Sequence, residues 1–176
     1  LESDGACAVV ITAAEHARDL KQKPVYIMGG AYGGGPSQGD DLFDAIRWPS
    51  HSHNCFKYLA DDLWGSAGIN PEDIDVAEIY DCFTYSVLMA LEGLGFCKDG
   101  EGGPFVMDGR IARDGALPVN THGGLLSEAY IHGFNHVIEA VEQLRGQSGA
   151  RQIEGAEIAL TTAGAMTCGS AMILRN

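Results

Sequence analysis

The chain has 176 residues, and its 11 Lys and Arg against 24 Asp and Glu give a formal net charge of -13. Its basic residues are scattered along the sequence, which argues against a nucleic-acid footprint or a membrane-surface patch. Its five cysteines show neither disulfide-like nor zinc-like spacing. With no long apolar run and no signal-peptide pattern, we expect a cytoplasmic chain with free thiols and with no nucleic-acid or membrane partner.

The first part of the sequence predicts two strands separated by a short helix. Residues 6–12 are an apolar run with β-branched residues and predict a strand, and residues 13–20 predict a helix. Residues 25–35 begin as a strand and run into glycines, after which 36–52 shows no periodicity and predicts a long loop.

The middle of the sequence predicts a helix, a turn, a strand and a second helix. Apolar residues recur at helical spacing over 53–67, with Gly68 as the stop. A turn with Pro follows, and then 76–81 predicts a buried strand and 83–96 a hydrophobic helix.

The last part of the sequence predicts a long connection, a helix and two strands. Residues 97–124 are rich in Gly, Asp and Pro, with a hairpin-like signal at VMDGRI. Residues 127–145 have the clearest helical periodicity, with Ser127 as the cap. Two strands joined by a tight turn are predicted over 156–164 and 170–175. The alternation of strands and helices favours a layered α/β domain with a mixed sheet.

Two stretches could carry chemistry, and each also has an ordinary structural interpretation. Tyr80 falls at a strand-to-helix junction, where its ring could belong to the core or its hydroxyl could act as an acid or base. Residues 120–133 place polar groups and a glycine pair before a helix. That setting suits an anion or oxyanion site, but a capped loop looks the same.

The cysteines and histidines carry weaker signals. Cys82 and Cys168 could include a nucleophile, but neither has a basic partner at a fixed spacing, so inert thiols are the simpler interpretation. His132 and His136 are four residues apart, a spacing that could bind a metal. Because the pattern indicates no third ligand, we favour histidines on a helix face and predict no metal site.

Two motifs carry a family resemblance. AEIYDCFT (77–84) and NTHGGLLSEAYIHG (120–133) resemble the C-terminal half of the thiolase superfamily, particularly the sterol-carrier-protein type, whose motifs read H-D-C-F and N-P-S-G-G-L-x-x-x-G-H-P-x-G. The resemblance implies an α/β class, thiolase-like layered α-β-α fold with a mixed five-stranded sheet. It assigns residues 1–22 to the end of the thiolase N-terminal domain and 23–176 to the C-terminal domain. Since the chain also begins without Met, we expect a missing N-terminal half that holds the position of the acyl-carrying cysteine.

The departures from the thiolase motifs make thiolytic chemistry doubtful. Tyr80 stands at the position of the oxyanion-hole histidine, and Tyr130 at that of the histidine that activates the nucleophile. The proton-shuttling cysteine of thiolases aligns near residues 163–165, which contain no cysteine, and Cys168 is out of register.

The pattern instead resembles the thiolase-like, lipid-transfer-protein aldolases of bacterial steroid side-chain degradation. These enzymes split a β-hydroxyacyl-CoA into a ketone and a shorter acyl-CoA with two tyrosines at these motif positions, bound to a partner with an OB-fold and a zinc ribbon. The resemblance implies an acyl-CoA carbon-carbon lyase with Tyr80 and Tyr130 as catalytic residues, in a homodimer, with no cofactor besides the coenzyme A of the substrate.

Residues around the two motifs are the candidates for substrate binding. They are Asp81, Phe83, His122, Gly123, Gly124 and His132. Two other functions stay open: an acetyl-CoA acyltransferase-type thiolase that cleaves a 3-ketoacyl-CoA, and a non-catalytic lipid or acyl-CoA carrier.

Overall fold

One mixed sheet forms the centre of the fold. The computed structural model describes residues 2–36 and 48–176, and its strands follow the order β1-β4-β3-β2. They are β1 (Tyr26–Gly34), β2 (Val76–Glu78), β3 (Ile158–Ala163) and β4 (Cys168–Arg175). β2 is parallel to β3, whereas β4 is antiparallel to both of its neighbours. The mixed sheet is confirmed, but it has four strands in the described residues and not the expected five.

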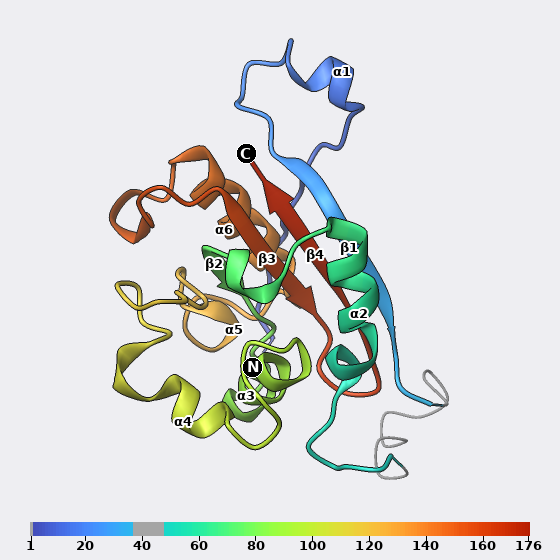
Figure 1. Cartoon of the computed structure of the whole chain (residues 1–176). Helices are drawn as coiled ribbons and strands as arrows, with labels where there is room; N and C mark the ends of the chain where they lie inside the picture. The colour runs from blue at the N-terminus through green and yellow to red at the C-terminus, as the bar shows by residue number, and fades with distance from the viewer. Residues whose placement is uncertain (1, 37–47) are drawn as a thin grey trace.

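Helices cover both faces of this sheet, as Figure 1 shows. They are α1 (Ala14–Ala17), α2 (Cys55–Ala67), α3 (Thr84–Gly93), α4 (Gly102–Val106), α5 (Gly124–Ser127) and α6 (Phe134–Arg145), with the 3-10 turns η2 (Pro71–Asp73), η3 (Met107–Gly109) and η4 (Gly149–Arg151). α2 packs on β1 and β4, while α6 packs on β2, β3 and β4 from the opposite side. The result is the expected layered arrangement.

Alternating strand residues supply the two halves of the core. Leu160 and Ile173 are fully buried on the side of α2 and α3, whereas their neighbours Ala159 and Leu174 pack against α6. Each buried Leu or Ile side chain contributes about 1.5–3 kcal/mol. Because both faces are covered, β2 is buried throughout and β3 is buried along all but its end residues.

The predicted stop of α2 is confirmed, and the helix begins at Cys55, two residues after its predicted start. Asn54 accepts a hydrogen bond from the Phe56 amide at 3.1 Å, which caps the first turn. Gly68 ends the helix in the left-handed region at φ 71°.

Of the two elements predicted for residues 6–20, the strand is wrong and the helix is shorter than its predicted range. Residues 6–12 form no strand and are largely exposed, and the helix is limited to the single turn of α1. A strand needs a neighbour that takes up its backbone hydrogen bonds, and no described strand lies beside this segment. Residues 6–12 therefore have the apolar composition of a strand but do not form one.

Two predictions near the second motif are also corrected. The hairpin-like signal at 106–111 forms the end of α4 and the turn η3, with Asp108 at φ 60° and Gly109 at φ 75°. The helix predicted for 127–145 is broken: α5 ends at Ser127 and α6 begins only at Phe134. Gly133, at φ 82°, starts α6 in place of Ser127 and creates the break.

Candidate active site

Two tyrosine hydroxyls meet beyond the end of β2. Tyr80 follows this strand, and its amide donates to the Thr162 hydroxyl on β3 at 2.9 Å. Tyr130 lies in the break between α5 and α6. The two hydroxyl oxygens are 3.0 Å apart, and the rings pack edge to face with centroids 6.2 Å apart. Residues from the two motifs are thus brought together.

A histidine and a carboxylate extend this pair. His132 Nδ1 lies 3.5 Å from the Tyr80 hydroxyl, at the outer limit of a hydrogen bond, and His132 Nε2 lies 3.1 Å from Glu2 Oε1. The sequence provides no signal for Glu2, because its role depends on a contact between distant segments. Contacts thus run from Tyr130 through Tyr80 and His132 to the exposed carboxylate of Glu2.

The N-terminal segment holds the main chain of Tyr130. The Ser3 amide donates to the Tyr130 carbonyl at 3.1 Å, and the Tyr130 amide donates to the Ser3 hydroxyl at 3.3 Å. Gly5 lies so close to the side chain of Ile131 that a Cβ would be 2.7 Å from it. Residues 2–5 therefore form one wall of the site.

Asn120 fixes the backbone beside Tyr80. Its side-chain oxygen accepts from the Ile79 amide at 2.7 Å, and its side-chain nitrogen donates to the Ile79 carbonyl at 2.9 Å. Asn120 itself is at φ 52°, a conformation that Asn tolerates better than most residues. Both polar groups of a fully buried residue are thereby satisfied.

The environment keeps the Tyr80 hydroxyl protonated. Its side chain is 8% exposed, and burial raises the pKa of Tyr80 well above its usual value, with a further increase from the hydrogen bond to Tyr130. Tyr130 is half-buried. Tyr80 is thus suited to donate a hydrogen bond, and Tyr130 is the more accessible of the two hydroxyls.

The predicted substrate-binding residues Asp81 and Phe83 differ in their exposure to solvent. Asp81 is 5% exposed, and its carboxylate accepts hydrogen bonds from the amides of Leu125 and Leu126 at 2.7 and 3.4 Å. Burial opposes its ionisation, but His136 and these amides outweigh burial and lower the pKa of Asp81. Phe83, in contrast, is 72% exposed.

The glycine pair forms a tight turn next to Asp81. Gly123 and Gly124 are both in the left-handed region, at φ 103° and φ 66°. A Cβ at Gly124 would collide with the Asp81 carboxylate. The pair thus allows the first turn of α5 to lie directly against the Asp81 carboxylate. A negative charge is stabilised at this end of a helix.

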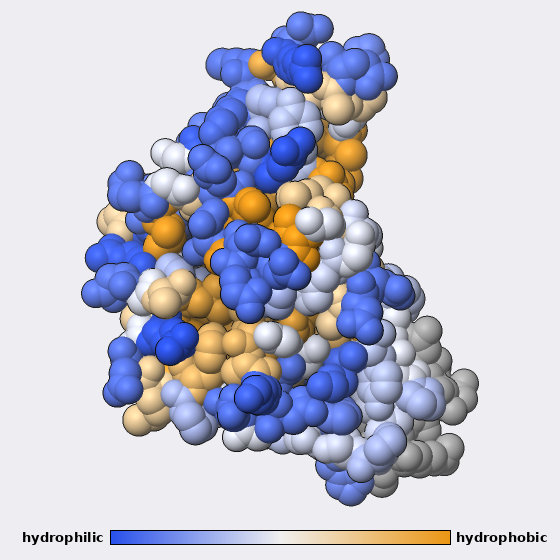
Figure 2. Space-filling view, in the orientation of Figure 1, coloured by the Kyte–Doolittle hydropathy of each residue, from blue (hydrophilic) through white to orange (hydrophobic). Residues whose placement is uncertain are grey.

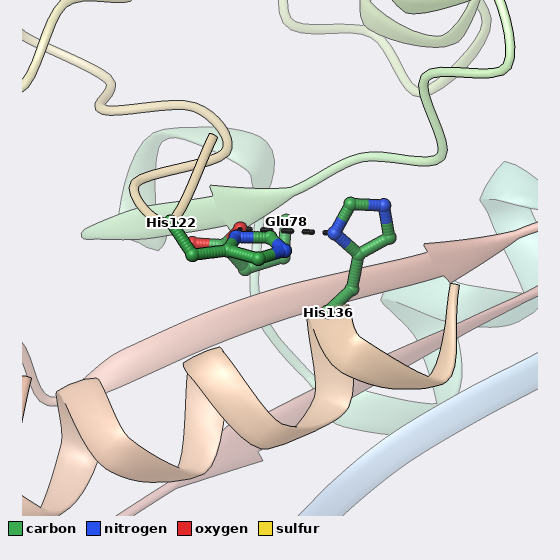
Figure 3. Close-up of side chains that lie close together, drawn as sticks. All are labelled: Glu78, His122 and His136. Carbon is green, nitrogen blue, oxygen red and sulfur yellow. Dashed lines mark ion pairs between the residues drawn. The ribbon is translucent and has the colours of Figure 1, made fainter. Parts of the chain in front are cut away.

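A buried cluster of Glu78, His122 and His136, shown in Figure 3, lies next to Asp81, whose Oδ1 is 3.5 Å from His136 Nε2. His122 Nδ1 is 2.9 Å and His136 Nδ1 is 3.9 Å from the same oxygen of Glu78. Burial lowers the pKa of His122, but the Glu78 carboxylate raises it by more. The pairing of His132 with His136 is not observed, because His132 precedes α6. The sequence held one sign of this cluster: Glu78 is a charged residue within the apolar run VAEIYD.

Among the described residues, Cys82 is the one cysteine in the cluster that holds the tyrosine pair. Ala163 and Ala165 pack with Tyr80, at the hairpin position where thiolases carry a cysteine. Burial and the nearby Cys168 raise the pKa of Cys55 to about 12. Cys82 lies in the same cluster as Tyr80, and its thiol donates to the Ser86 hydroxyl at 3.6 Å.

Comparison with known proteins decides the family. The family described as Thiolase C-terminal domain-like matches residues 47–176. The chain belongs to this family.

Two relatives of this thiolase C-terminal domain are similar over 98% of the chain. One is the 17-hydroxy-3-oxo-4-pregnene-20-carboxyl-CoA lyase of Mycobacterium tuberculosis, 44% identical, and the other is the steroid side-chain-cleaving aldolase of Thermomonospora curvata, 42% identical. The chain spans 44% of the length of each relative.

A solved structure shares the same fold. The Ltp2-ChsH2(DUF35) aldolase superposes with a TM-score of 0.87 and 40% sequence identity over 92% of this chain and 42% of that chain. The thiolase-like fold is thereby confirmed. Among the described residues, no helix combines the length and the apolar character needed to cross a membrane.

Proposed function

We propose that the protein containing this chain is a thiolase-like aldolase that cleaves a β-hydroxyacyl-CoA, a steroid side-chain CoA ester, by a retro-aldol reaction. The observation that carries the proposal is the 3.0 Å contact between the Tyr80 and Tyr130 hydroxyls. The names of the two relatives, a CoA lyase and a side-chain-cleaving aldolase, support it.

The reaction requires one proton to move and one carbon-carbon bond to break. A base takes the proton of the β-hydroxyl, the bond between the α- and β-carbons breaks, and the β-carbon becomes a ketone. The electron pair passes to the thioester as an enolate, which takes up a proton at its α-carbon to give the shorter acyl-CoA. No thiol nucleophile and no free coenzyme A are consumed.

The two tyrosines have different roles in this proposal. Tyr130, the more accessible hydroxyl, faces the substrate hydroxyl and relays its proton. Tyr80 stays protonated throughout, because it receives a proton from Tyr130 as it passes its own to His132, and its hydrogen bond stabilises negative charge on Tyr130. His132, linked to Glu2, offers a path by which the proton leaves the pair.

The other predicted residues are assigned supporting roles. Asp81 positions α5 and the loop that carries Tyr130, while Gly123 and Gly124 let the backbone approach the thioester. His132 and the exposed Phe83 contact the substrate, and the buried His122 acts from behind the turn.

Further parts of the proposal concern the whole protein. Coenzyme A enters as part of the substrate, and no separate organic cofactor is needed. The solved relative is described as an Ltp2-ChsH2(DUF35) aldolase, and the second component of that name supports an OB-fold and zinc-ribbon partner. A missing N-terminal half and a homodimer complete the proposed assembly.

The decisive experiment is product analysis by mass spectrometry. The full-length protein with its partner is supplied with a β-hydroxyacyl-CoA that carries a tertiary hydroxyl, without free coenzyme A. The wild type should release a ketone and a shorter acyl-CoA, and Tyr80→Phe and Tyr130→Phe should each lower kcat by roughly 10²–10⁴-fold.

A matched control separates chemistry from packing. Tyr32→Phe removes a hydroxyl from a tyrosine that is 76% exposed on β1 and should leave the rate unchanged. Cleavage that occurs only with free coenzyme A and a 3-ketoacyl-CoA would establish a thiolase and refute the proposal. Tight binding of the acyl-CoA without turnover would instead indicate a carrier.

A further inference from the structure

Three side chains from separate segments point at one buried place between the sheet and α6 (Figure 3). Glu78 ends β2, His122 lies in the turn before α5, and His136 is in the first turn of α6. One oxygen or nitrogen from each lies within 4.8 Å of the other two. The side chains of Glu78 and His136 are 0% exposed and that of His122 is 2% exposed.

The atoms that face one another lack ordinary hydrogen-bond partners. Within residues 2–36 and 48–176, Glu78 Oε2, His122 Nδ1 and His136 Nδ1 are buried and make no hydrogen bond. Leaving such atoms without partners destabilises the folded state, and more so where the group is charged. His122 Nδ1 and Glu78 Oε2 are in ion-pair contact at 2.9 Å, whereas His136 Nδ1 is 3.9 Å from Glu78 Oε2, too far for a hydrogen bond. An ion between the three groups would give His136 Nδ1 the partner that it lacks.

The far side of each group is supported in the manner of a metal ligand. His136 Nε2 lies 3.5 Å from Asp81 Oδ1, and His122 Nε2 lies 3.5 Å from Glu128 Oε2. Metal-binding histidines commonly present their second nitrogen to a carboxylate, which fixes the ring and increases its basicity.

Glu78 is supported in the same way. Its other oxygen, Oε1, accepts hydrogen bonds from the Thr121 hydroxyl at 2.8 Å and the Thr121 amide at 3.3 Å. Oε2 alone is therefore turned toward the histidines. Glu78 is thus held by hydrogen bonds at its other oxygen, while His122 and His136 each have a carboxylate 3.5 Å from the second ring nitrogen.

We propose that Glu78, His122 and His136 bind a divalent zinc ion. Two imidazole nitrogens and one carboxylate oxygen are a ligand set that Zn²⁺ uses, with ligand atoms about 2.0–2.2 Å from the ion. Two such atoms on one ion are separated by roughly 3–4 Å, and the observed separations from Glu78 Oε2 are 2.9 and 3.9 Å. The ion's charge is balanced by Glu78 and the adjacent Asp81.

The position of the site gives the ion a structural role. It joins the end of β2 to the turn before α5 and to α6, and these are the segments that hold Tyr80 and Tyr130. The ligands are inaccessible to a large substrate. The zinc therefore holds together the segments that carry Tyr80 and Tyr130, and it takes no direct part in bond cleavage.

The test measures metal content, so its outcome is independent of the proposed aldolase activity. The full-length protein is purified without any zinc-containing partner, from medium supplemented with Zn²⁺, and analysed by mass spectrometry of its metals. Compared with the wild type, His122→Gln and His136→Gln should each lose about one zinc per chain. His16→Gln, which changes an exposed histidine on α1, should lose none.

A second measurement on the wild type keeps the proposal testable if the variants do not fold. After treatment with a chelator, the protein should take up Co²⁺ and gain visible absorption bands, and added Zn²⁺ should remove them. Equal zinc in wild type and folded variants, or a chelator-treated wild type that takes up no Co²⁺, would overturn the proposal. The cluster would then be a buried network of ionised side chains.

Discussion

At the residue scale, Gly133 decides how close Tyr80 can come to the start of α6. It is at φ 82°, and a Cβ there would lie only 2.8 Å from Cδ2 of the Tyr80 ring. Any side chain would therefore displace the ring, in addition to the strain that a positive φ imposes. The tyrosine pair depends on a residue that has no functional group.

Gly133→Ala should lower the free energy of unfolding by about 1–3 kcal/mol and should also lower kcat, because it moves the Tyr80 hydroxyl. Gly146→Ala is the matched control: Gly146 ends the same helix at φ 71° with nothing within 4 Å of a Cβ. It should lose stability and retain its kcat. Denaturant unfolding and steady-state rates measure the two effects, and equal losses of kcat would contradict this account.

Single residues differ in how far the sequence could predict them. Tyr80 and Tyr130 were selected from motif positions, and the structure brings their hydroxyls together. Glu2 could not be selected, because its importance arises from a contact with a distant segment, and His136 was considered only as a partner of His132. Glu78 was within reach, since a charged residue inside a run that is buried on both faces requires a partner.

At the element scale, the site depends on a break in what the sequence predicts as one long helix. The periodicity of 127–145 is real, and α6 uses it from Phe134 onward. Local backbone geometry at His132, φ 50°, and Gly133 overrides that periodicity and frees Tyr130 from the helix. α2, whose stop at Gly68 agrees with its periodicity, was predicted to within two residues.

Asn120 connects the two motifs, because its side chain makes two hydrogen bonds to the main chain of Ile79. Asn120→Gly keeps the positive φ but removes both hydrogen bonds to Ile79, so two buried backbone groups lose their partners. We expect the free energy of unfolding to fall by about 1–3 kcal/mol, with a loss of kcat because Tyr80 is the next residue. Thermal unfolding followed by circular dichroism and rate measurements would show both.

Asp108→Gly provides the comparison for this change. Asp108 is also at positive φ, 60°, and it lies in η3. Its replacement should change stability little and leave kcat intact. If Asn120→Gly behaved like Asp108→Gly, the two hydrogen bonds from Asn120 to Ile79 would not contribute to stability or rate.

At the scale of the whole molecule, the segment before β1 leaves apolar surface uncovered. Val10 is 92% and Ile11 75% exposed, and Figure 2 shows hydrophobic residues reaching the surface. A cavity of about 730 Å³ lies between residues 8–27 and the outer face of α6, where Val137 and Val141 line it. Such a surface favours association.

The isolated chain should therefore aggregate or bind a hydrophobic dye, whereas the full-length protein should not. Val10→Ser together with Ile11→Ser should reduce aggregation of the isolated chain, since it removes the most exposed apolar side chains. Light scattering and size-exclusion chromatography provide the measurement. An isolated chain that stays monomeric and unfolds cooperatively would contradict the prediction.

This scale also explains why the first strand prediction failed. Residues 6–12 have the composition of a strand, but strand formation depends on a neighbouring strand and not on the segment alone. The division of the chain at residue 22 into parts of two domains stays a prediction.

The hydrogen bonds between Ser3 and the main chain of Tyr130 join residues separated by 127 positions. Contacts between such distant parts of a chain carry a large loop-closure entropy and tend to form after local ones. The sheet and its helices can assemble before this contact is made. A folding chain would then form its sheet and helices first, and the wall beside Tyr130 last.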